Sequence, residues 1–193
     1  MALIPLRSIE ELDGAPREVA ESGLAQYGSI LNTWAALMTK PDLFAAYLPF
    51  LRQVAGPGVL EAETKDLSAL LVAYLNGCRY SVSHRAASAR KNGVDDELMR
   101  CVVAEKWAVL DPRLRAALEL TRELTLLPPA VTPGELPHGV TEEVRDRARQ
   151  TFTDVELLEL TFSISVWNAL TRFHRVMGFE LDMPEPPEGF DPS

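Results

Sequence analysis

The sequence predicts an all-α protein, and three observations support this fold class. Apolar residues recur at helical spacing along most of the 193-residue chain, as in residues 29–38. Helix-start signals precede several of these segments, among them Pro41-Asp42 and a capping box from Thr153 to Glu156. No segment alternates apolar and polar residues as a half-buried strand does. We therefore expect helices joined by turns.

Each expected helix is bounded by residues that start or stop helices. We expect Pro49 to kink or shorten the second helix, Asn76-Gly77 to turn the chain, and residues 127–140, rich in Pro and Gly, to form a linker. The acidic, proline-rich tail is expected to be extended. The expected helices cover residues 29–38, 39–54, 61–75, 78–93, 95–107 and 111–127, with two more opening at Thr141 and Thr153.

Composition excludes several classes of function. A formal net charge of −9 disfavours nucleic acid and anionic membrane as partners, because both require a basic surface. The N-terminus does not have the basic and apolar pattern of a signal peptide, and no apolar run is long enough to span a bilayer. Two cysteines are too few for a disulfide framework. We expect a cytoplasmic protein with reduced thiols.

Two stretches of the chain resemble each other at an offset of 90 residues. Residues 66–85 align without a gap on residues 156–175, and both end in His-Arg. This alignment predicts a duplication, with repeat units at about 61–93 and 153–178. The two units would pack about a pseudo-twofold axis, and only the first would carry a thiol.

One helix start carries the residues best suited to chemistry. Cys78 follows a turn, where unpaired N–H groups and the helix dipole stabilise a thiolate. Ser81 and His84 follow on the same helix, and His84 could take a proton from either. A helix hairpin at Asn76-Gly77 would bring the carboxylate of Asp66 beside His84. The alternative is structural: a buried apolar cysteine, a helix-start serine and a core histidine.

The remaining candidates are weaker. Arg79 and Arg85, two turns apart with Tyr80 between them, could bind an anionic substrate, although solvated arginines are the simpler interpretation. Cys101 and His174 are expected to be structural. The three histidines lack metal-ligand spacing, so no metal or other cofactor is predicted.

The quoted residues resemble a known family. The segments "NTWAALMTKPDLFAAYLPF", "DLSALLVAYLNGCRYSVSHRAASARKNGVDDELM" and "WNALTRFHRVMGF", the last with Asn168 and Arg172, are similar to the carboxymuconolactone decarboxylase and alkylhydroperoxidase D-like superfamily. The resemblance covers residues 29–182, preceded by an N-terminal extension (1–28) and followed by the tail (183–193). It implies a single all-α domain and assembly into trimers or hexamers.

The family's peroxidases carry Cys-x-x-Cys, a later His and an earlier Glu. Cys78 matches the first Cys of that motif, whereas Ser81 stands at the second. Arg85 stands at the His position, with His84 one residue earlier, and Asp66 stands at the Glu position. Without a thiol at position 81, the family's local disulfide cannot form.

Three functions follow from the resemblance and the site. The first is a cofactor-free enzyme that performs acid–base chemistry on a small anionic or carbonyl substrate, with His84 as acid and base and Asp66 orienting it. The second is a one-cysteine hydroperoxide reductase that uses Cys78, an antioxidant role. The third is a degenerate member that binds a ligand without turnover. The tail from Leu181 onward is expected to lie across a neighbouring subunit.

Overall fold

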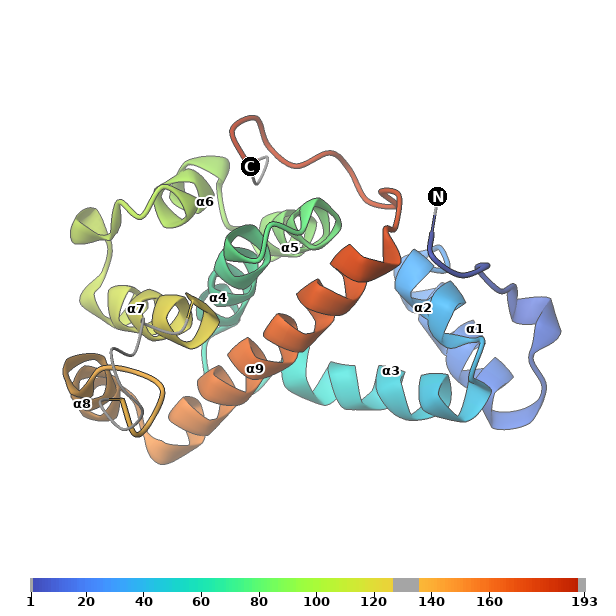
Figure 1. The fold of residues 1–193 in the computed structure, drawn as a ribbon, viewed down its shortest axis with the longest axis horizontal. Helices are drawn as coiled ribbons and strands as arrows, with labels where there is room; N and C mark the ends of the chain where they lie inside the picture. Colours follow the sequence, from blue (N-terminus) through green and yellow to red (C-terminus); the bar gives the residue numbers. More distant parts are fainter. Residues whose placement is uncertain (1, 127–135, 191–193) are drawn as a thin grey trace.

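The computed structural model describes residues 2–126 and 136–190 and is built from helices (Figure 1). Two short 3-10 helices, Ile9–Glu11 and Trp107–Val109, accompany the α-helices, and the described residues contain no strand. The expected all-α fold in a single domain is confirmed. The α-helices are α1 (Gly14–Tyr27), α2 (Asn32–Leu37), α3 (Pro41–Ala55), α4 (Ala62–Leu75), α5 (Arg79–Lys91), α6 (Asp96–Val103), α7 (Pro112–Leu126), α8 (Glu142–Thr151) and α9 (Asp154–Met177).

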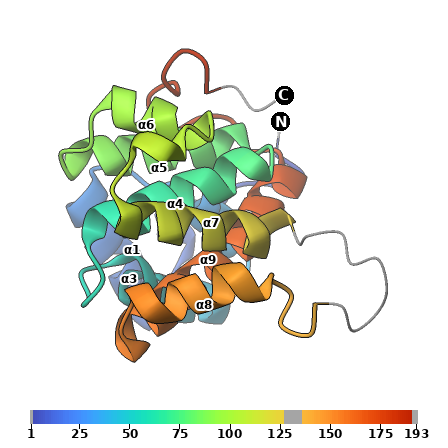
Figure 2. The ribbon, with the colours of Figure 1, turned by 90° about the vertical axis from the view of Figure 1, so that its left-hand side faces the viewer.

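Helix α4 forms the centre of the molecule. Every residue from Thr64 to Ala73 is buried, as expected for a helix that is apolar on more than one face. Figure 2 shows α4 between α5 and α7, and α9 packs against it as well. Leu67, Leu70 and Leu71 contribute to one core cluster with α5 and α6, while Val72 contributes to a second with α7, α8 and α9.

The first three helices form a second packed group at the other side of α9 (Figure 1). Trp34, Phe44 and Leu48 are its buried core, and Ala20 of α1 joins them. The N-terminal segment predicted as an extension therefore includes a helix that packs against α3. Helix α9, which begins at the expected capping box of Thr153 and Glu156, contacts α3, α4, α5 and α7.

Two details of the helices differ from expectation. Pro49 does not end α3, which continues to Ala55. Pro49 is exposed, so water can bind the carbonyl group that proline leaves without an intrahelical partner. The predicted repeat is not seen as two alike units, because residues 66–85 fold as helix, turn and helix, whereas residues 156–175 lie within the continuous helix α9. The linker residues 127–135 lie outside the described part of the chain.

The segment after α9 packs on its own chain. It runs along α5 toward α6 (Figure 1), and Phe190 is fully buried in the core beside these helices. Ser83 of α5 donates a hydrogen bond to the carbonyl of Pro184 at 2.8 Å. We expected this tail to lie across a neighbouring subunit, and the structure shows residues 181–190 packed on α5 and the core of their own chain.

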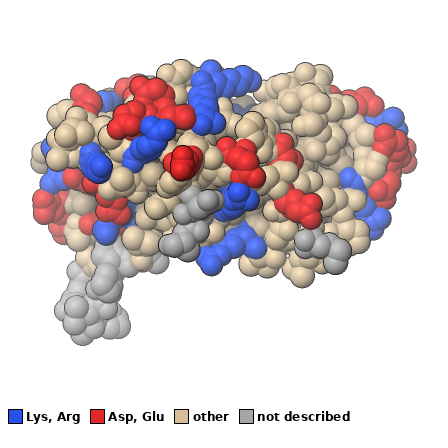
Figure 3. Space-filling model, turned by 90° about the horizontal axis from the view of Figure 1, so that it is seen from above, with Lys and Arg blue, Asp and Glu red and all other residues tan. Residues whose placement is uncertain are grey.

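None of the helices in the described ranges is both long and apolar enough to cross a membrane. On the face shown in Figure 3, acidic and basic side chains are interspersed among uncharged residues. The net negative charge is thus not gathered into one patch on that face.

Candidate functional site

Cys78 lies at the N-cap of α5, where a tight turn places it. Gly77 adopts a φ of 65°, a left-handed conformation that favours glycine. A Cβ atom at this position would lie 3.4 Å from the guanidinium of Arg175. The amide of Asn76 donates to Asn168 on α9 at 2.9 Å and so fixes the turn against that helix. The backbone N–H of Cys78 donates to Ala73 at 3.1 Å. The thiol is buried, with 2% of the residue exposed.

The Cys78 thiol is hydrogen bonded to a serine and, through it, to a histidine of α9. Its Sγ lies 3.1 Å from Oγ of Ser81, and that Oγ lies 2.9 Å from Nδ1 of His174. All three residues are buried. Because Ser81 is three residues after Cys78, both face the same side of α5, toward α9.

The chain of hydrogen bonds continues beyond His174. Its Nε2 lies 3.0 Å from Oγ1 of Thr33, which donates to the Tyr80 hydroxyl at 3.2 Å. Tyr80 donates to Oδ2 of Asp182 at 2.8 Å. The other oxygen of Asp182 lies 2.5 Å from Nε2 of His84. One network thus links the thiol to a carboxylate in the segment after α9.

The carboxylate at the end of the network sets the direction of every bond. Burial acts to raise the pKa of Asp182, but hydrogen bonds from His84, from the Asn32 N–H and from Tyr80 outweigh it and lower the pKa. The ionised carboxylate can only accept. Tyr80 must therefore donate to it.

The same reasoning assigns the tautomer of His174. With Tyr80 donating to Asp182, the hydroxyl of Thr33 donates to Tyr80 and accepts from Nε2–H of His174. Nδ1 is then left to accept from Ser81. Burial and the positive charges of His84 and Arg85 lower the pKa of His174 to about 3, so the ring is neutral and keeps this acceptor. Ser81 in turn accepts the S–H of Cys78.

His84 does not belong to the thiol end of the network. It is six residues from Cys78, a rotation of about 600° that places it roughly 120° away around α5. Its ring centroid lies 4.4 Å from that of Tyr80, with the two rings tilted by 40°, and it pairs with Asp182. Burial, opposed by Asp182 and reinforced by Arg85, lowers the pKa of His84. The expected transfer of a proton to His84 from Cys78 or Ser81 has no contact to support it.

Asp66 is also placed differently from the prediction. Its two oxygens accept hydrogen bonds from Ser88 at 2.9 Å and Asn92 at 2.5 Å, near the far end of α5. The antiparallel packing of α4 on α5 brings residue 66 level with residues 88 to 92 rather than with His84. The expected Asp66–His84 pair is therefore replaced by Asp182–His84.

The predicted substrate-binding residues fall into three different settings. Arg79 is half-exposed and forms an ion pair with Glu185 of the tail. Tyr80 is buried, and burial raises the pKa of its hydroxyl. Arg85 lies one turn after Ser81, with its guanidinium carbon 4.1 Å from the ring centroid of Trp167. These three side chains do not share one pocket wall.

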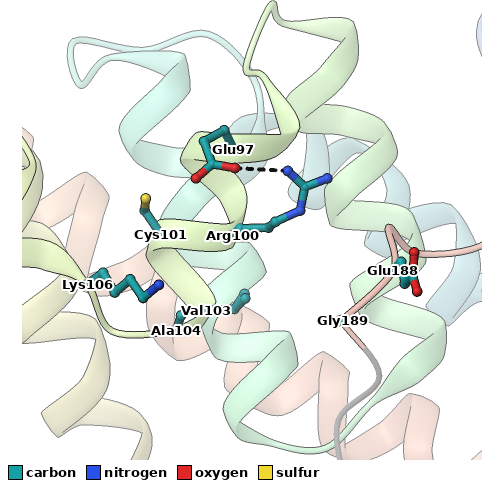
Figure 4. Close-up of a pocket in the computed structure, with 8 residues that line it drawn as sticks. All are labelled: Glu97, Arg100, Cys101, Val103, Ala104, Lys106, Glu188 and Gly189. Carbon is teal, nitrogen blue, oxygen red and sulfur yellow. Dashed lines mark hydrogen bonds and ion pairs between the residues drawn. The ribbon is translucent and has the colours of Figure 1, made fainter.

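Cys101 is partly exposed rather than a core residue. It lines a cavity of about 260 Å³ between α6 and the tail, together with Lys106 and Glu188 (Figure 4). Both cysteines are free thiols. Within the part of the chain that the structure describes, no three His, Cys, Asp or Glu side chains are grouped to hold a metal ion.

Three members of the network were not predicted as functional. The alignment of residues 66–85 on 156–175 pointed to His174, which we interpreted as structural. Thr33 and Asp182 come from α2 and from the tail, and the sequence singled out neither as a candidate. Only the tertiary structure brings them to α5.

Fold and site together define an all-helical protein with a hydrogen-bonded cysteine at the start of a helix. A model of the carboxymuconolactone decarboxylase family matches residues 41–123. The protein YdfG of Bacillus subtilis (strain 168) is 30% identical over 118 residues, which cover 60% of this chain and 74% of YdfG. The chain belongs to the carboxymuconolactone decarboxylase family.

Solved structures show the same fold at low sequence identity. A peroxidase-related protein from Ralstonia eutropha JMP134 with an alkylhydroperoxidase core superimposes with a TM-score of 0.76 at 19% identity, covering 98% of this chain and 94% of that one. A peroxidase-related protein from Silicibacter sp. TM1040 gives 0.74 at 20%, with 97% and 93% covered. The debrominase Bmp8 gives 0.76 at 16%, with 93% and 92% covered.

Proposed function

We propose that this protein is a one-cysteine hydroperoxide reductase with Cys78 as the reacting group. The observation that carries the proposal is the buried chain from Cys78 through Ser81 to His174, with distances of 3.1 and 2.9 Å. It offers the thiol proton a path to a neutral imidazole, as nucleophilic catalysis by cysteine requires. Two structural relatives are described as peroxidase-related, which agrees with this chemistry.

The reaction follows from the bonding. The Cys78 proton moves to Ser81, and the Ser81 proton to Nδ1 of His174, only as the sulfur attacks, because a ring with a pKa of about 3 does not hold the proton beforehand. The sulfur attacks the terminal oxygen of the hydroperoxide: an S–O bond forms, the O–O bond breaks, and the leaving alkoxide takes a proton back from His174 through Ser81. The products are an alcohol and a sulfenic acid on Cys78.

Reduction of the sulfenic acid requires a thiol from outside the chain. Ser81 cannot form a disulfide, and Cys101 lies on a different helix, facing a separate cavity. One external thiol would displace water to give a mixed disulfide with Cys78. A second would release Cys78 and leave as a disulfide.

Trapping of the sulfenic acid tests this function. We expect a dimedone adduct at Cys78 after stoichiometric cumene hydroperoxide, detected by intact mass and peptide mapping. Cys101→Ser should react as the wild type does, and Cys78→Ser should give no adduct at position 78. Ser81→Ala should slow the reaction. A wild-type protein that forms no adduct, or forms it only at Cys101, would refute the proposal.

A second candidate is cofactor-free acid–base catalysis at His84, favoured by the 2.5 Å contact between His84 and Asp182. Asp182 takes the orienting role that the sequence assigned to Asp66. Turnover of two variants distinguishes the two candidate functions. Acid–base turnover would be lost in His84→Gln and kept in Cys78→Ser. A wild type that shows no turnover but binds ligand would favour a binding role without catalysis.

A further inference from the structure

Arg85 lies at the inner side of α5, one helical turn beyond Ser81. Its guanidinium stacks on Trp167 of α9 at 4.1 Å, and the residue is partly exposed. Tyr27 of α1 and Tyr47 of α3 lie within electrostatic range of it. Tyr27 is 44% exposed, so solvent reaches this side of the cluster. Arg85 therefore lies against an aromatic ring of α9, with Tyr27 and Tyr47 near enough to act on its charge.

The guanidinium has no partner for its donors. Nε is shielded from solvent and has no hydrogen-bond acceptor, and no hydrogen bond or ion pair to Arg85 is present among residues 2–126 and 136–190. Nε of Arg52 and of Arg115 also has no acceptor, but Arg52 donates to Ser22 through another nitrogen and Arg115 lies 3.9 Å from Glu119. Arg85 differs because none of its nitrogens has such a partner among the described residues. A shielded donor without an acceptor is costly. An acceptor from outside the chain would remove that cost.

The positive charge of Arg85 is not neutralised by a carboxylate bound to it in the described structure. Burial lowers the pKa of Arg85, and the carboxylate of Asp66 opposes this effect, so the guanidinium keeps its charge. Both oxygens of Asp66 are taken by Ser88 and Asn92 and do not reach the arginine. Asp66 thus weakens the positive potential at Arg85 but accepts none of the hydrogen bonds that its guanidinium can donate.

We propose that Arg85 binds the carboxylate of a substrate or ligand that has an aromatic or apolar body. A planar carboxylate accepts two parallel hydrogen bonds from a guanidinium fork, and the ring of Trp167 provides an apolar surface beside it. The placement relative to Cys78 rests on the proposed function. Arg85 follows Cys78 by seven residues on one face of α5, which corresponds to a rise on the order of 10 Å along the helix. The substrate would therefore be a hydroperoxide with a carboxylate at its other end.

Binding of a simple acid tests the site without any turnover. The probe is 3-phenylpropanoate, and its neutral amide, 3-phenylpropanamide, is the control ligand. We expect calorimetry to show saturable binding of the acid by the wild type, weakened about tenfold or more in Arg85→Gln. The amide should bind both proteins equally. Arg172→Gln, an exposed arginine of α9, should behave as the wild type.

A second measurement guards against a variant that misfolds. In the wild type, the acid should shift the Nε–H resonance of Arg85 in the NMR spectrum, and Arg85→Lys, which keeps the charge but not the fork, should bind the acid more weakly. No saturable binding by the wild type, or equal binding by Arg85→Gln, would overturn the proposal. So would an effect of Arg85→Gln on oligomeric mass alone, because a second copy would then supply the acceptor.

The link to catalysis is measured separately. The rate of Cys78 oxidation should be higher for a hydroperoxide acid than for its methyl ester, and this preference should disappear in Arg85→Gln. If Cys78 does not react at all, the proposed function fails, while the titrations with 3-phenylpropanoate still decide the Arg85 site.

Discussion

His174 shows how burial and hydrogen bonding select one protonation state of a residue. Its ring is buried between Ser81 and Thr33, and both neighbours are hydroxyl groups rather than carboxylates. Neither hydroxyl compensates a charge on the ring, and burial lowers its pKa to about 3. The neutral ring has one donor and one acceptor, which is the state that a relay between two hydroxyl groups requires.

This pKa shift predicts how stability depends on pH. The unfolded chain protonates His174 below about pH 6.5, whereas the folded protein resists protonation down to about pH 3. The unfolded state therefore binds the extra proton, and stability falls as the pH falls through this window. Between pH 7 and pH 5 the histidine accounts for a loss of about 2 kcal/mol in the free energy of unfolding.

The variant His174→Gln should lose less stability than the wild type over that interval, by about the same 2 kcal/mol. Urea unfolding at pH 7 and pH 5 measures it. The pH range lies above the usual carboxyl pKa values, and the contribution of His84 largely cancels between the two proteins. An equal decline in both proteins would mean that His174 is protonated in the folded state.

The segment after α9 acts as an element in its own right, although it has no helix. Phe179 and Leu181 pack in the apolar cluster that covers Cys78, and Asp182 ties the segment to α5 and α2. Residues near the N-terminus complete the cover, because the Leu3 N–H donates to the carbonyl of Met177. A reagent reaches the thiol only when this cover opens locally.

Weakening the Asp182 contacts should therefore expose the thiol. In a Cys101→Ser background, where Cys78 is the only thiol, we expect Asp182→Asn to react with a disulfide reagent about tenfold faster than the parent. Charge-assisted bonds to His84 and the Asn32 N–H would be replaced by weaker ones. Glu185→Gln is the matched control, since Glu185 lies in the same segment and pairs with the half-exposed Arg79. Equal rates in the two variants would show that Asp182 does not hold the cover.

The helices were more predictable than the contacts between them. Local signals set the start of α9 at the capping box of Thr153 and Glu156, and the turn at Asn76-Gly77, because those bonds form within a few residues. The pairing of Asp182 with His84 joins residues 98 positions apart. No local pattern encodes it, and a closer carboxylate, Asp66, was the natural expectation.

In the candidate site, too, the local contacts were easier to predict than the contacts between helices. Cys78 and Ser81 were placed correctly at the start of α5 and do contact each other, because three residues on a helix fix their separation. Their histidine partner, His174, lies on α9, so this contact depends on how α9 packs against α5. The sequence offered His84 on the same helix, but helical rotation turns it away.

At the scale of the whole molecule, one apolar surface on α3 and α9 is left exposed by the described residues. Phe50 of α3 and Phe162 of α9 meet edge to face at 6.0 Å, and Val155 and Leu158 extend the surface along α9. We call these four residues the α3–α9 patch. Their exposed fractions are 45%, 48%, 51% and 68%, respectively. We infer that a second copy of the chain covers this patch, as the superfamily resemblance led us to expect.

A charge in the patch should break that assembly. Because burial of a carboxylate against apolar side chains is strongly unfavourable, we expect Phe162→Glu to lower the mass of the particle measured by sedimentation or light scattering, with the helical content unchanged. Val109→Glu is the matched control, since Val109 is 80% exposed and lies outside the patch. A wild type that is monomeric, or a Phe162→Glu protein of unchanged mass, would contradict the inference. A fall in mass with Cys78 reactivity retained would in addition show that the site lies within one subunit, as the network from Cys78 to Asp182 suggests.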